Sequence, residues 1–142
     1  MAELSKEMTE ISHAAAGLLV QKAIEAARRK SLSVAVAIVD NGGNLKAFGR
    51  DDGCLFLPAE IACDKAWTAV SFGYPTHAWN ELVADKNIAP LASHPRLTAV
   101  GGGFPVKLRG QMVGGIGISG GNYADDMEIA QQAIRDAGFD AV

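Results

Sequence analysis

A lysine set among small apolar residues is the side chain of this sequence best suited to acid–base or anion-binding chemistry. Lys65 follows Ile61 by one helical turn and lies in line with Phe72. A lysine in this setting either lays its stem along the apolar face with its amine in water, or holds the amine at the mouth of a pocket. In the pocket the amine binds a carboxylate, or acts as a base where desolvation lowers its pKa. Lys65 is therefore the candidate catalytic residue.

Three consecutive glycines offer a second kind of chemistry. Gly101, Gly102 and Gly103 form either a bulge or bend between strands, or a run of exposed backbone N–H groups beside a pocket. Exposed N–H groups of this kind bind an anionic oxygen. Pro105 removes one donor from the sheet ladder and indicates an edge strand or a bulge.

The three histidines do not have the spacing of zinc ligands. His13 lies about 200° from Ile11 around a helix that turns about 100° per residue, so it faces away from the core. It is either a surface residue or a metal or haem ligand used across a subunit interface. His77 lies near Tyr74 and Trp79, where the three form either a packed loop or a site for a flat ligand.

Other motifs of small-molecule chemistry are missing or weak. The sequence has no phosphate-binding P-loop and no Gly-x-Ser-x-Gly nucleophile elbow. The glycines at 115, 117 and 120 match Gly-x-Gly-x-x-Gly, but they begin inside a predicted strand and no βαβ unit surrounds them. Cys54 and Cys63 are nine residues apart and indicate reduced thiols of a cytosolic protein.

Length and composition predict one folded domain over residues 1–142. Hydrophobic residues make up 49% of the chain and charged residues 20%, which excludes a disordered protein. The net charge of −3 argues against a nucleic-acid or acidic-membrane partner. No apolar run approaches the ~20 residues of a membrane-spanning helix, and the N-terminus does not resemble a secretory signal. We therefore expect a cytoplasmic protein.

The elements that position these residues alternate between helices and short strands. Apolar spacing and capping residues predict helices over 9–30, 58–72, 77–85 and 123–137, the first capped by Thr9. β-branched residues and tight turns predict strands over 33–39, 45–50, 97–100, 104–108 and 111–119. Strands joined by tight turns are antiparallel. The order predicts an α+β fold with one five-stranded antiparallel sheet flanked by helices.

The last predicted strand carries an unusual number of glycines. Gly114, Gly115 and Gly117 lie inside it, and each weakens a strand unless something approaches the backbone closely. A helix crossing the sheet, a second subunit or a ligand would do so. Together with the high apolar content, this predicts a symmetric homo-oligomer with a ligand site near a subunit boundary. A Gly115→Val change would then split or misassemble the oligomer.

Four motifs in this order resemble one family. They are the strand and turn over 34–45, the Glu-Ile-Ala-x-Asp-Lys-Ala-x-Thr-Ala stretch over 60–69, the Gly-Gly-Gly-x-Pro of 101–105 and the glycine-rich strand over 113–120. The chain closely resembles the GlcG/HbpS-like family, which includes the C-terminal domain of PduO-type proteins and the OrfY-like proteins. The resemblance implies a profilin-like sheet and homo-oligomers, and for some members haem or another tetrapyrrole.

The resemblance also implies functional residues. Some members ligate iron through a histidine near the first helix, the place of His13. Lys65, the glycines 101–103, Ser119 and Gly120 fall on recurring family motifs. The leading hypothesis is an oligomeric small-ligand-binding protein, with haem to be tested first. The alternative is a small enzyme acting on an organic acid or carbonyl compound, in which Lys65 is anchor or base and the glycine amides polarise the substrate. A third is an accessory subunit without a ligand of its own.

Overall fold

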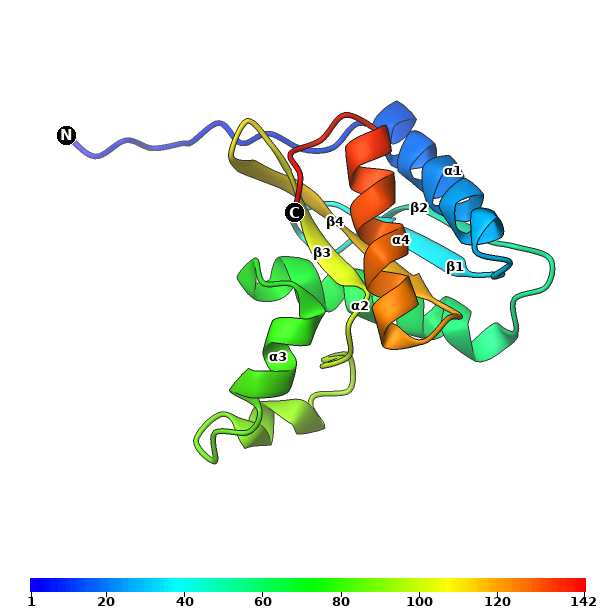
Figure 1. Ribbon diagram of the computed structural model, residues 1–142. Coiled ribbons are helices and arrows are strands. Elements are labelled where there is room, and N and C mark those ends of the chain that lie inside the picture. The colour runs from blue at the N-terminus through cyan, green and yellow to red at the C-terminus, as the bar shows by residue number, and fades with distance from the viewer.

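The protein is an antiparallel sheet with helices on both faces (Figure 1). The structure is a computed structural model that describes residues 1–142. Its elements, in chain order, are α1 (His13–Arg29), β1 (Ala35–Val39), β2 (Leu45–Arg50), α2 (Phe56–Phe72), α3 (Thr76–Leu82), the short 3₁₀ helix η1 (Ala89–Ser93), β3 (Gly103–Leu108), β4 (Gln111–Ser119) and α4 (Tyr123–Asp136). No helix combines the length and the apolar character needed to cross a bilayer.

The sheet has four strands in the order β2-β1-β4-β3, all antiparallel. β2 and β3, which includes Pro105, are its edges. The predicted α+β class is confirmed, but the fifth strand, over 97–100, is wrong. The backbone N–H of Thr98 donates to the Thr68 hydroxyl of α2 at 3.0 Å, and that hydroxyl donates to the Arg96 carbonyl at 3.1 Å. This segment is therefore fastened to a helix side chain instead of a neighbouring strand.

The two faces of the sheet differ in side-chain size. On one face Val36, Ile38 and Ile116 pack with the apolar stripes of α1 and α4. On the other face Ala35 and Ala37 pack against α2. Side chains of β1 point alternately to the two faces of the sheet, and both faces are buried. Large side chains pack under α1 and α4, and small ones pack under α2. Figure 1 shows α4 and α1 on the side opposite α2.

Gly115 and Gly117 of β4 are explained by the close approach of α2. A Cβ atom on Gly115 would lie 2.7 Å from Val70 Cγ1 and 3.0 Å from the Ala66 carbonyl oxygen. One on Gly117 would meet the backbone of Ala62 and Ala66. Of the three partners considered for this strand, the structure shows the crossing helix. A Gly115→Val change would therefore act inside the chain, by overpacking α2, before any subunit contact.

Element boundaries differ from the sequence prediction mainly at helix starts. α1 is capped by Ser12, whose hydroxyl accepts from the Ala15 N–H at 3.1 Å, and not by Thr9. Thr9 instead donates its hydroxyl to Gln111 Oε1 at 2.6 Å. Ile11 is buried, and its N–H donates to the Val113 carbonyl at 2.9 Å. These contacts fasten the chain to β4 before the helix begins, which delays its start.

The turn between β1 and β2 depends on a carboxylate. Asp40 Oδ1 accepts from the N–H groups of Gly42 at 2.9 Å and Asn44 at 3.0 Å. Partial burial alone would raise the pKa of Asp40, but the hydrogen bonds from Asn44 and Gly42 outweigh it and lower that pKa below its usual value. The stability that Asp40 contributes is therefore complete above about pH 4 and is lost as the pH falls through the lowered pKa.

Asp40→Ala is accordingly expected to lower the free energy of unfolding by about 1 kcal/mol at pH 7 and by less at pH 3. Urea denaturation of both proteins from pH 7 to pH 2.5 measures this difference. Asp52→Ala is the control, because the Asp52 carboxylate accepts no hydrogen bond within the chain. A gap between wild type and Asp40→Ala that stays constant with pH would show that the carboxylate charge does not hold the turn.

Candidate functional site

The amine of Lys65 lies in the interior of the protein and not at a pocket mouth. α2 carries Lys65 over the sheet, where the residue is 2% exposed. Its Nζ donates to the Ile118 carbonyl of β4 at 2.9 Å and to Asp126 Oδ2 of α4 at 3.1 Å. One side chain therefore joins α2, β4 and α4. Neither placement expected from the sequence, with the amine in water or at a pocket mouth, is found, and the surface cavities described below have other linings.

Asp126 is the residue of this cluster that sequence reasoning missed. It is buried in the first turns of α4, and its Oδ1 accepts from the Gly121 N–H at 2.9 Å. Burial raises the pKa of Asp126, against the opposing charge of Lys65. Burial lowers the pKa of Lys65, against the charge and hydrogen bond of Asp126. The only sequence signal was an acidic residue near the start of a helix, which is typical of helix capping as well.

The glycine triplet lies beside Lys65 and serves packing. Gly102 has φ +128°, and a Cβ there would lie 2.8 Å from Lys65 Nζ. A Cβ on Gly103 would lie 2.6 Å from the Lys65 carbonyl oxygen. The Gly103 N–H donates to the buried Thr76 hydroxyl at 2.9 Å. The triplet therefore lets α2, α3 and β4 meet around the lysine, and all three glycines are buried.

Gly120, one of the sequence-predicted site residues, lines a surface cavity. Ser119 beside it is buried, whereas Gly120 is exposed and has φ +133°. The cavity has a volume of about 570 Å³ and is lined by Ser31, Leu32, Ser33, Gly53, Cys54, Leu55, Phe56, Leu57, Pro58 and Gly120. Leu55, Phe56 and Leu57 are 76%, 85% and 56% exposed. Three consecutive exposed apolar side chains are typical of a surface that another molecule covers.

His13 is exposed at the first turn of α1, as predicted. The neighbouring exposed residues on this part of the helix are Ala14, Gly17 and Leu18. A Cβ on Gly17 would have nothing within 4 Å, so this surface is open. Positions three and four apart share a helix face, and no charged residue interrupts this one before Lys22. The imidazole therefore stands next to a smooth, uncharged surface.

The other two histidines are also exposed but stand in different surroundings. His77 lies 5.6 Å from Phe104 between ring centroids, whereas Tyr74 and Trp79 form ring contacts with each other and with Phe72. His94 stacks on Trp67 at 5.2 Å, with the planes 15° apart. No three His, Cys, Asp or Glu side chains stand close enough together to hold a metal ion.

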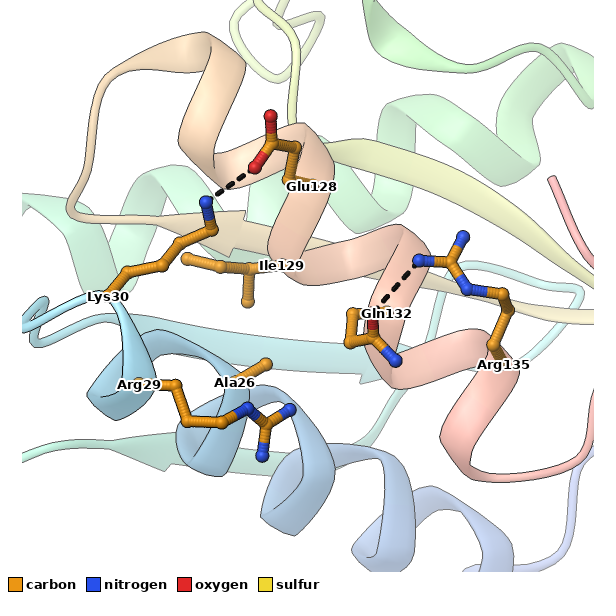
Figure 2. Close-up of a pocket in the computed structure, with 7 residues that line it drawn as sticks. All are labelled: Ala26, Arg29, Lys30, Glu128, Ile129, Gln132 and Arg135. Atoms are coloured by element: carbon orange, nitrogen blue, oxygen red, sulfur yellow. Dashed lines mark hydrogen bonds and ion pairs between the residues drawn. The ribbon is translucent and has the colours of Figure 1, made fainter.

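A cavity between α1 and α4 is lined mainly by charged and polar residues (Figure 2). Its volume is about 380 Å³, and Ala26 and Ile129 are its apolar lining. Lys30 reaches across to Glu128, and Arg135 bonds Gln132. Lys30 is thus ion-paired with Glu128, whereas Arg135 contacts a neutral amide, and the cavity includes none of the sequence-predicted residues.

Comparison with known proteins gives a consistent set of relatives. A family model described as "Haem degrading protein HbpS-like" matches residues 11–135. The corrinoid adenosyltransferase PduO of Salmonella typhimurium (strain LT2) is 36% identical over 135 residues, which are 92% of this chain and 40% of PduO. The chain thus spans about two fifths of the length of that relative.

Two solved structures match almost end to end. The crystal structure of Klebsiella pneumoniae protein ORFY is 28% identical, with a TM-score of 0.90, and covers 96% of this chain and 97% of that one. The PduOC:heme complex is 31% identical, with a TM-score of 0.84, and covers 94% of this chain and 99% of that one. One of these similar proteins was therefore solved with haem.

Proposed function

Because the chain belongs to the HbpS-like family, we propose that it is a cytoplasmic, one-domain protein that binds haem as a homo-oligomer, with His13 as the iron ligand. The observation that carries this proposal is the pairing of a solved haem complex of a similar protein with an exposed histidine on an uncharged helix face. A bound haem would supply a redox-active iron whose reactivity the surrounding protein tunes.

The surface around His13 suits a flat apolar ring. The imidazole is exposed, so its nitrogen can reach an iron without rearrangement of the core. Ala14, Gly17 and Leu18 form an uncharged, apolar surface against which a porphyrin face would pack. No carboxylate on this part of the helix would repel the propionates of haem.

A second copy of the chain would supply the rest of the site. One helix face covers at most one side of a porphyrin, and the other side would remain in water. The exposed Leu55–Leu57 segment is a further surface that association would bury. These observations support a homo-oligomer with the ligand at or near a subunit boundary.

Haemin titration tests the role of His13. Wild type is expected to shift the Soret band in a saturable manner, and His13→Ala is expected to weaken haemin affinity at least tenfold or to change the spectrum. His77→Ala and His94→Ala are matched controls, because both side chains are exposed histidines outside this surface. They are expected to titrate like wild type.

Two results would overturn parts of the proposal. If haemin added to the wild-type protein gave no Soret shift, haem would not be its ligand. If His13→Ala gave the same shift as wild type, His13 would not be the iron ligand. Light scattering at micromolar concentration tests assembly separately, and a monomeric mass in both the presence and the absence of haemin would remove the oligomer.

The enzyme hypothesis built on Lys65 stays a prediction with less support. Its amine is buried and paired, and the Gly103 amide is already used by Thr76. Turnover at Lys65 would require the interior to open.

A further inference from the structure

A cavity on α3 differs in chemistry from the others. Its volume is about 420 Å³, and it is lined by Tyr74, Ala78, Glu81, Leu82, Asp85 and Ile88. The spacing of 78, 81, 82 and 85 places these residues along one side of α3 and of the turn that continues it. Figure 1 shows α3 projecting from the sheet, away from α1.

The charges lining this cavity are all negative. Glu81 and Asp85 line it, and no lysine or arginine does. Neither carboxylate belongs to an ion pair, whereas Asp51, Asp64 and Asp126 all do. Asp85 Oδ1 accepts only from the Asn87 N–H, at 2.8 Å. The cavity therefore presents two carboxylates with unused acceptor capacity beside apolar walls.

An aromatic ring forms a further wall and is held in place by two others. Tyr74 is 46% exposed, and its ring centroid lies 6.3 Å from both Phe72 and Trp79. Trp79 is buried and lies next to the Tyr74 ring without itself lining the cavity. The face of an aromatic ring attracts cations.

We propose that this cavity binds a small organic ammonium ion. The cationic head would lie between the Glu81 and Asp85 carboxylates and the Tyr74 ring, and its alkyl groups would contact Leu82 and Ile88. This chemistry is opposite to that of haem, whose propionates the two carboxylates would repel. The site is therefore independent of the one proposed on α1.

Choline and its neutral analogue 3,3-dimethyl-1-butanol separate charge recognition from apolar binding. The Trp67→Phe protein leaves Trp79 as the only indole, because the chain has two tryptophans. Its fluorescence, together with calorimetry on the wild-type protein, is expected to report saturable choline binding in the millimolar range. The neutral analogue is expected to bind at least tenfold more weakly.

Variants test the named side chains. Glu81→Gln combined with Asp85→Asn is expected to weaken choline binding at least tenfold, and Tyr74→Leu three- to tenfold. Glu60→Gln is the matched control, because Glu60 is an exposed carboxylate outside the cavity, and it is expected to bind choline like wild type. Circular dichroism confirms that each variant is folded.

Three results would overturn the proposal. They are equal binding of choline and the neutral analogue, unchanged choline affinity in the double variant, and no saturable binding up to 50 mM. The last result, combined with an oligomeric mass that falls in Tyr74→Leu, would show that a second copy of the chain occupies the cavity instead.

Discussion

Replacing Lys65 with methionine is expected to lower the free energy of unfolding by about 3–5 kcal/mol. Methionine fills much of the volume of the lysine stem, but it removes the cation beside Asp126. The carboxylate would then remain in the interior with only the Gly121 N–H as partner. Chemical denaturation followed by circular dichroism measures the change. The expected loss is large because the amine is buried.

A second variant distinguishes a lost ion pair from a lost packing contact. Lys65→Met combined with Asp126→Leu removes both charges and is expected to regain most of the stability that the single change loses. Lys46→Met is the control for the loss of a lysine, since Lys46 is exposed on β2. If the free energy of unfolding of Lys65→Met differed from that of wild type by less than about 0.5 kcal/mol, the structural role of the ion pair would be contradicted.

Gly117→Ala is expected to be strongly destabilising although it adds one methyl group. The new Cβ would meet the Ala62 carbonyl oxygen and would lie 2.6 Å from the Ala66 backbone nitrogen. Backbone atoms of a helix cannot move aside as a side-chain end can, so α2 would have to shift away from the sheet. Overpacking of this kind costs about 1–3 kcal/mol, and more where the obstacle is rigid. Thermal and urea denaturation measure the loss.

Gly17→Ala is the matched comparison. Gly17 lies inside α1, and a Cβ there would meet no atom within 4 Å. The same chemical change is expected to raise the free energy of unfolding by about 0.5–1 kcal/mol, because glycine is a poor helix former. If Gly117→Ala and Gly17→Ala changed the free energy of unfolding in the same direction, the close contact between α2 and β4 would be contradicted.

Much of the fold could be predicted from the sequence because its signals are local. The β-branched run of β1, the Asn–Gly turn after it and the Gly73 cap of α2 each depend on neighbouring residues. The strand predicted over 97–100 failed for the opposite reason. Its apolar residues suited a strand, but Thr68, some 30 residues away, provides the hydrogen bonds that a neighbouring strand would have provided. The profilin-like arrangement implied by the resemblance stays a prediction.

The candidate site was harder to predict, because burial and pairing join distant parts of the chain. Lys65 and Asp126 are 61 residues apart, and no pattern in the sequence couples them. The glycines of β4 did indicate a close neighbour, but not which one. His13 was predicted to be exposed from helical spacing alone, and the structure confirms this. Its role as an iron ligand depends on a molecule outside the chain and stays a prediction.

The outer strands determine how copies of this chain can meet. A strand with a free edge is a template on which another chain can continue the hydrogen-bond ladder. On β3, Pro105 interrupts that template because its nitrogen carries no hydrogen. On β2, the exposed cations Lys46 and Arg50 would be brought against their own counterparts if two such edges were paired. Growth by strand addition is therefore disfavoured on both sides, and we expect any association between copies to use helical surfaces instead of the edges of the sheet.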